Sequence, residues 1–225
     1  MKALLYKEFK LAMHPICYVF IVAFPLMVLI PSYPIAVGFI YTLVCSPILF
    51  LGANKGQQSN DLLYSTLLPI RKKDIVLARV FTIVILQFAF IALTSALVPL
   101  SLLIKQSIAS SSDKPVVDAG FGLQSYVLVL AIVIIGYALA DIIFFPIYYK
   151  NGKSIVMSTL MTIIGFVIYT GIFTIALPYI PGLEFLNQLP LYIQFIVLGV
   201  ALLIYFLIHL VVYKVSSKRL EKVDF

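Results

Sequence analysis

Residues 75–104 read IVLARVFTIVILQFAFIALTSALVPLSLLI, a run in which Arg79 is the only charged side chain. A helix that crosses the hydrocarbon core of a bilayer needs about 20 mostly apolar residues, because each residue rises about 1.5 Å through a core about 30 Å thick. The run therefore predicts a membrane-spanning helix. Its excess length predicts that this helix is tilted or extends beyond the bilayer.

Five further apolar stretches lie on either side of this run. They are Ile16–Tyr33, Ile35–Ala53, Tyr126–Tyr149, Ser154–Tyr179 and Leu191–Tyr213. Hydrophobic residues make up 63% of the chain and charged residues 11%, whereas a soluble domain is about half apolar and about a quarter charged. We therefore expect an all-α polytopic membrane protein with six transmembrane helices, forming a single transmembrane domain over residues 1–225.

The basic residues fall almost entirely on one side of the predicted membrane. Of the 16 lysines and arginines, all but Lys105 and Lys114 lie in segments that this topology places on one face. The positive-inside rule assigns that face to the cytoplasm. We therefore expect a multi-pass protein of the plasma membrane with both termini cytoplasmic. The net charge of +7 then reflects topology and attraction to anionic membrane lipid rather than binding of nucleic acid.

Both ends of the chain are polar extensions of the predicted domain. Residues 1–14 place Leu4, Leu5 and Phe9 on one side of a helix and lysines around the rest, which predicts an interfacial helix lying in the plane of the membrane surface. The charges within this segment, and the absence of a small-residue cleavage site after the first apolar run, argue against a cleavable signal peptide. Residues 214–225 form a basic cytosolic tail.

Residue patterns for catalysis, metal binding or nucleotide binding are missing from the sequence. Its two histidines have no acidic pair at metal-ligand spacing. Gly152-Lys153-Ser154 matches the end of a phosphate-binding loop, but the required earlier glycine is replaced by Ile147. Cys17 and Cys45 lie within predicted spans and are expected to be free, packed thiols. We therefore expect no enzyme activity, metal or cofactor in this chain.

The connection between the second and third predicted spans has the pattern of a short amphipathic helix at residues 57–69. Asp61 can cap its start, and Pro69 ends it. The apolar strip consists of Leu62, Leu63, Tyr64, Leu67 and Leu68, and a basic cluster of Arg71, Lys72 and Lys73 follows. Such a helix can transmit force from a cytosolic partner, or it can simply rest on the lipid surface.

Two segments resemble the type-2 ABC transporter permeases of Gram-positive bacteria. One is MKALLYKEFK at residues 1–10, followed by His14-Pro15, and the other is DLLYSTLLPIRKKDIVLAR at residues 61–79. The six-span layout resembles that family over the whole chain. Within that family, the chain resembles the branch that exports amphipathic cytolytic peptides in staphylococci and related bacteria.

This resemblance implies a permease subunit of an ATP-driven exporter for a hydrophobic or amphipathic peptide or lipid. It implies a dimer with a second permease copy or a sister permease, and separate ATPase subunits that bind ATP and Mg²⁺. The helix at 57–69 becomes the coupling helix, which inserts into the ATPase with the basic cluster at the rim. The alternatives from other classes are a stand-alone membrane enzyme, a small secondary carrier, or a non-transporting immunity protein.

One acidic residue, Asp141, lies clearly inside a predicted span. An ionised carboxylate within the membrane costs about 2.5–3.5 kcal/mol on insertion scales, so it needs a partner or must be neutral. Arg79 enters the third span from the same face, and its long side chain can extend toward the carboxylate. We therefore expect an Arg79–Asp141 pair near the cytoplasmic end, with His209 as the second candidate partner of Asp141.

Overall fold

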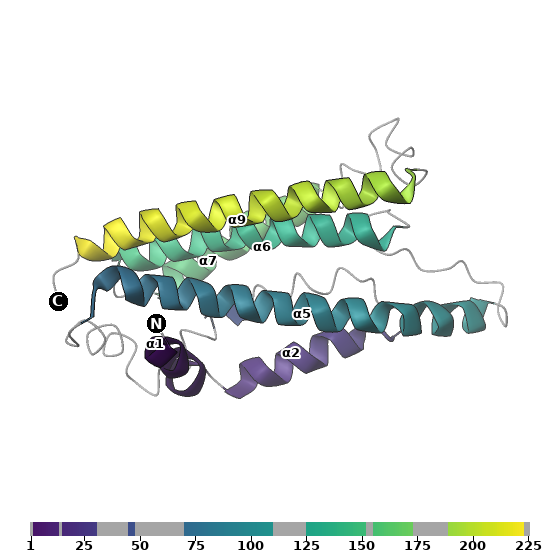
Figure 1. Cartoon of the computed structure of the whole chain (residues 1–225), viewed down its shortest axis with the longest axis horizontal. Helices are drawn as coiled ribbons and strands as arrows, with labels where there is room; N and C mark the ends of the chain where they lie inside the picture. Colours follow the sequence, from purple (N-terminus) through teal and green to yellow (C-terminus); the bar gives the residue numbers. More distant parts are fainter. Residues whose placement is uncertain are drawn as a thin grey trace.

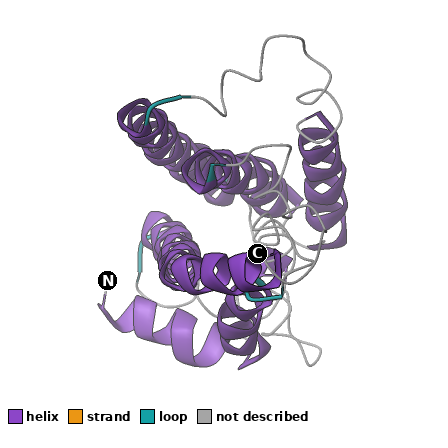
Figure 2. Ribbon diagram, turned by 90° about the vertical axis from the view of Figure 1, so that its right-hand side faces the viewer, coloured by secondary structure: helices purple, strands orange, loops and turns teal. Residues whose placement is uncertain are grey.

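The described part of the chain is helical throughout. The computed structural model describes residues 2–13, 15–30, 45–47, 70–109, 125–151, 155–172 and 189–222. Within these ranges every regular element is a helix (Figure 2). The predicted all-α class is therefore confirmed. The predicted helix at 57–69 and most of the second span lie outside the described residues.

Among the described helices, three are long and apolar enough to span a membrane. They are α5 (Lys72–Ala109), α6 (Tyr126–Asn151) and α9 (Leu191–Glu221), with 38, 26 and 31 residues. At about 1.5 Å per residue, α5 is about 57 Å long, which exceeds the hydrocarbon core of a bilayer. The predicted excess length of the third span is thus confirmed.

The remaining described helices are shorter. α7 (Ile155–Gly171) is a shorter, mostly apolar helix, and α2 (Pro15–Met27) follows the N-terminal helices α1 (Lys2–Lys7) and η1 (Glu8–Ala12). Residues 2–10 and α2 qualify together as one span bent by 79°. The described residues therefore contain three spans, or four if the bent pair counts, and the full set of six stays a prediction.

Helix α6 lies at the centre of the packing. It packs along α9 and α7, while α5 packs against α9 and α2 (Figure 1). Tyr137, Phe144 and Phe145 of α6 are completely buried. At Gly165 of α7, an added Cβ would lie 2.5 Å from Cδ1 of Ile143, so glycine permits the close approach of α7 to α6. The outward faces of α7 and α9 are apolar and exposed, as expected for helices that face lipid.

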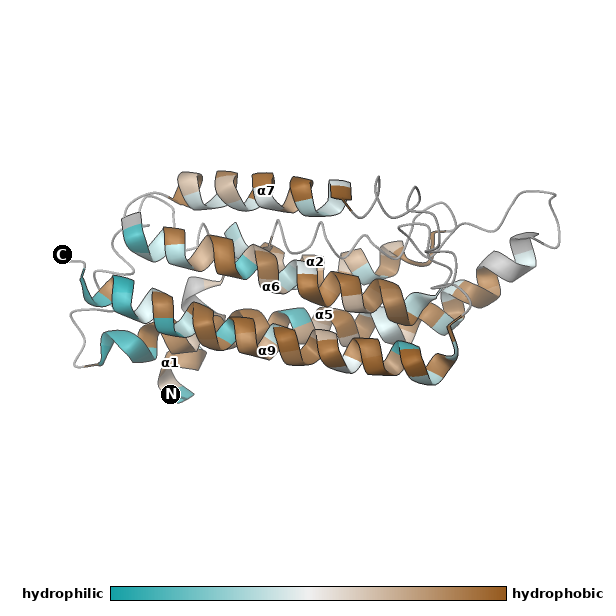
Figure 3. Ribbon diagram, turned by 90° about the horizontal axis from the view of Figure 1, so that it is seen from above, coloured by the Kyte–Doolittle hydropathy of each residue, from teal (hydrophilic) through white to brown (hydrophobic). Residues whose placement is uncertain are grey.

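Hydrophilic residues gather at one end of the bundle (Figure 3). The start of α5, the last turns of α9 and α1 all lie at this end (Figures 1 and 3). The salt bridge between Lys73 Nζ and Glu221 Oε1, at 3.3 Å, joins the start of α5 to the end of α9. This arrangement agrees with both polar extensions being on one side of the membrane, while the assignment of that side to the cytoplasm stays a prediction.

The N-terminal segment is held against the bundle. Leu4 and Glu8 are buried, and the Tyr18 hydroxyl donates a hydrogen bond to the carbonyl of Phe9 at 2.8 Å. Cys17 and Cys45, from α2 and the helical turn at 45–47, are thiols outside any disulfide and are buried in the core, so the prediction of packed thiols is confirmed. The position of residues 1–14 relative to the lipid surface stays a prediction.

Buried polar networks as a candidate functional site

Asp141 lies in the middle of the three-helix contact between α5, α6 and α9. Its side chain is completely buried. The amide Nε2 of Gln87, from α5, donates to Asp141 Oδ2 at 2.8 Å. His209 Nε2, from α9, lies 3.1 Å from the same oxygen. A single carboxylate oxygen therefore connects all three helices.

Two further contacts close this arrangement into a ring. The Tyr205 hydroxyl donates to Oε1 of Gln87 at 2.6 Å. His209 Nδ1 lies 2.8 Å from the backbone carbonyl of Tyr205, one turn earlier on α9. All four side chains are buried, and we call Gln87, Asp141, Tyr205 and His209 the central network.

The hydrogen-bond partners of His209 indicate how a proton is shared between His209 and Asp141. A carbonyl oxygen can only accept, so His209 Nδ1 carries a hydrogen toward Tyr205. The contact between His209 Nε2 and Asp141 Oδ2 then holds one proton, on either atom. The pair is consequently either an imidazolium facing a carboxylate or two neutral groups. Both arrangements have no net charge, which lowers the cost of placing the pair in an apolar bundle.

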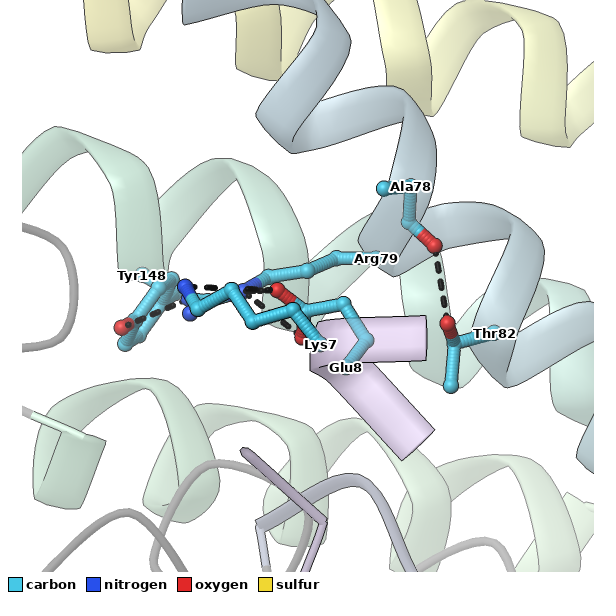
Figure 4. A network of polar contacts seen from close by, with 6 residues as sticks. All are labelled: Lys7, Glu8, Ala78, Arg79, Thr82 and Tyr148. Atoms are coloured by element: carbon cyan, nitrogen blue, oxygen red, sulfur yellow. Dashed lines mark hydrogen bonds and ion pairs between the residues drawn. The ribbon is translucent and has the colours of Figure 1, made fainter. Parts of the chain in front are cut away.

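Arg79 belongs to a second network (Figure 4), and it lies nearer the start of α5 than Gln87 does. Its Nε lies 3.3 Å from both carboxylate oxygens of Glu8, and its Nη1 donates to the Tyr148 hydroxyl at 3.3 Å. Lys7 Nζ lies 3.9 Å from Glu8 Oε1. Arg79 and Glu8 are 2% and 1% exposed. We call Glu8, Arg79 and Tyr148 the end network, which connects η1, α5 and α6.

The predicted Arg79–Asp141 pair is corrected by these contacts. Arg79 pairs with Glu8, and Asp141 pairs with His209, the second candidate. The reason is the vertical register of the helices. Tyr148 and Asp141 are seven residues apart on α6, and Arg79 and Gln87 are eight apart on α5, which separates the two levels by about 10–12 Å. Gln87, rather than Arg79, therefore lies at the level of Asp141.

Sequence reasoning missed Glu8 and Gln87, although both left a signal. Gln87 is the only side-chain amide in the run at 75–104, and a strongly polar residue within a membrane helix calls for a partner. Glu8 lies four residues after the buried Leu4, so the two share a helix face. That spacing indicates a carboxylate turned toward the protein, although its flanking lysines suggest a surface position.

The rim residues of the predicted coupling site begin α5. Arg71 and Lys73 are exposed and Lys72 is half-buried. Lys73 contacts Glu221, and Arg219 donates to the carbonyl of Pro146, so the end of α9 lies beside both α5 and α6. The other predicted site residues lie outside the described residues, namely Asp61, Leu62, Leu63, Tyr64, Leu67 and Leu68.

Long apolar helices that are joined by buried polar networks and end in a charged surface define a polytopic membrane protein. Residues 3–217 match the family model described as ABC-2 family transporter protein, so the chain belongs to this family. The predicted resemblance to type-2 ABC permeases is confirmed. No match was found among curated proteins or among solved structures. Members of the family are membrane components of ABC exporters and normally work with a separate ATPase subunit.

Proposed function

We propose that this protein is the membrane-spanning permease subunit of an ATP-driven exporter for a hydrophobic or amphipathic substrate, a peptide or a lipid. The observation that carries the proposal is the family match over residues 3–217, which the long apolar helices support. The chain resembles exporters of amphipathic cytolytic peptides, which favours a peptide substrate. ATP and Mg²⁺ are bound by a separate cytosolic ATPase, and this chain performs no chemistry on the nucleotide.

The ATPase docks on the segment that precedes α5. The apolar strip at 62–68 enters a groove of the ATPase, and Arg71, Lys72 and Lys73 lie at its rim. The exposure of Arg71 supports this arrangement, because its side chain is accessible to an acidic partner surface. Leu63, Tyr64 and Leu67 contribute most of the association, about 1–3 kcal/mol each for buried side chains of this kind.

The transporter is a dimer of two such permeases, or of this chain and a sister permease, in the plasma membrane. Both termini are cytoplasmic. The exposed apolar face of α7, where Val167 and Ile168 are 59% and 58% exposed, is available to lipid or to the second permease. Closure of the two ATPase subunits pulls on the paired coupling helices and shifts the dimer between two states of access.

Affinity purification of the chain from its native membrane tests the proposal. The expected result is co-purification of an ATPase, and ATP-dependent export after both are placed in lipid vesicles. The variant Tyr64→Asp, Leu67→Asp removes two apolar contacts and should lose recruitment of the ATPase while still inserting into the membrane. The matched control is Ser65→Asp, Thr66→Asp, which adds the same charge beside the apolar strip. Normal recruitment and export by the first variant would refute the docking site.

A further inference from the structure

Helix α5 is joined to α6 differently from the other neighbours of α6. α6 packs along α9 and α7 through close side-chain contact, including the approach at Gly165. Between α5 and α6, long polar side chains make the link at three levels. These links are Arg79 to Tyr148, Gln87 to Asp141, and Ser95 to Tyr126. The middle level is the one that also includes α9, through Tyr205 and His209.

We propose that the central network is an interhelical clasp that transmits a displacement of α5 to α6 and α9, so that the three helices move together during the transport cycle. This inference rests on the proposed function, because the displacement of α5 originates at the docking segment that precedes it. It assigns a positioning role to Gln87 and Tyr205, which lie far from that segment.

Gln87 connects to both other helices at once. Its amide nitrogen donates to Asp141 on α6, and its amide oxygen accepts from Tyr205 on α9. A shift of α5 along its axis by two residues, about 3 Å, would stretch both hydrogen bonds beyond bonding distance. It would leave the buried Gln87 amide and the buried Tyr205 hydroxyl without these partners, and Asp141 with His209 alone, which is unfavourable in an apolar interior. The lower-energy response is for α6 and α9 to follow α5.

The start of α5, which follows the proposed docking segment, contacts the neighbouring helices directly. Lys73, in the first turn of α5, contacts Glu221 of α9, and Arg79 contacts Glu8 of η1 and Tyr148 of α6. One helix therefore carries the docking end, the end network and the central network in sequence. Thr82 and Thr94 of α5 are also buried, but each donates to a carbonyl of its own helix, Ala78 and Phe90. The hydroxyls of Thr82 and Thr94 thus provide controls that break no hydrogen bond between helices.

The test compares substrate exported per ATP hydrolysed in vesicles that contain the complete permease–ATPase complex. Tyr205→Phe removes the hydroxyl that donates to Gln87, and Gln87→Glu replaces the donor to Asp141 with a second carboxyl group. Each should lower the export-to-hydrolysis ratio about tenfold, the factor for one ordinary hydrogen bond. The control Thr94→Val should leave the ratio unchanged.

A reversed pair gives a sharper test. In Gln87→Glu, Asp141→Asn, the new asparagine donates to the new glutamate, and Tyr205 still has an acceptor on α5. The double variant should recover most of the ratio that Gln87→Glu loses. If it folds but stays uncoupled, the position of the negative charge matters rather than the clasp, and the proposal is overturned. It is also overturned if Tyr205→Phe lowers thermal stability but leaves the ratio at the native value. Failure of the unmodified complex to export with ATP would instead overturn the proposed function.

Discussion

Removal of one partner from the buried Glu8–Arg79 ion pair should destabilise the protein strongly. Both groups are almost completely buried, at 1% and 2% exposure, and Arg79 Nε lies 3.3 Å from each oxygen of Glu8. Glu8→Leu leaves the guanidinium with the Tyr148 hydroxyl. Breaking a buried pair in this way costs about 3–5 kcal/mol, because a charge stays buried without its counter-charge.

The double variant Glu8→Leu, Arg79→Met separates the cost of an orphaned charge from the value of the pair. Replacing both charges with apolar side chains of similar volume is often neutral or stabilising by about 1–4 kcal/mol. We therefore expect the double variant to be more stable than either single variant. Lys7→Met is the control, because Lys7 Nζ lies 3.9 Å from Glu8 Oε1, farther than Arg79 Nε at 3.3 Å, so its removal should cost less than either loss from the Glu8–Arg79 pair.

The assay is reversible unfolding of the purified protein in mixed micelles, followed by circular dichroism as the fraction of denaturing detergent rises. The reasoning is refuted if Glu8→Leu costs less than about 1 kcal/mol, the range of an exposed pair. It is also refuted if the losses of the two single variants simply add in the double variant, because groups in direct contact are expected to be coupled.

Three further predictions concern other parts of the bundle. Oδ2 of Asp141 contacts both Gln87 and His209, so Asp141→Asn keeps only one of these two hydrogen bonds when His209 is neutral, and we expect a loss of about 1 kcal/mol in the same unfolding assay, whereas His209→Leu should cost about 2–4 kcal/mol; equal losses would contradict the assigned contacts. Gly165→Ala requires a movement of the Ile143 side-chain end, while Gly165→Leu should overpack the α6–α7 contact and lower stability by about 1–3 kcal/mol. Cys17 and Cys45 are 0% and 4% exposed, so both thiols should react with maleimide far more slowly in folded protein than after denaturation, as mass spectrometry can measure.

The apolar runs predicted the long helices well because membrane insertion depends on length and composition, which are local properties of the sequence. The runs at 126–149 and 191–213 correspond to α6 and to most of α9, although α9 continues to Glu221. Hydropathy does not predict the last turns of this helix, because the chain becomes polar at Lys214. The helix continues there because Ser216, Ser217 and Leu220 are still buried in the bundle.

The partners of the buried charges could not be predicted in the same way. Pairing depends on the axial register and rotation of helices that are far apart in the sequence. A rise of about 1.5 Å per residue gave approximate depths for Arg79 and Asp141, but it did not fix which faces met. Gln87 pairs with Asp141, and Glu8 pairs with Arg79. Their polarity can be seen in the sequence, but the identity of their partners follows only from how the helices pack.

The central claim is that this chain is a permease whose energy comes from a separate ATPase, and ATP turnover tests it most directly. The measurement is hydrolysis and export in lipid vesicles that contain the purified chain alone, the co-purified ATPase alone, or both together. The account predicts no ATP hydrolysis by the chain alone, and ATP-dependent export of an amphipathic peptide or a lipid when both are present. ATP turnover by the isolated chain, or export without the ATPase, would contradict it.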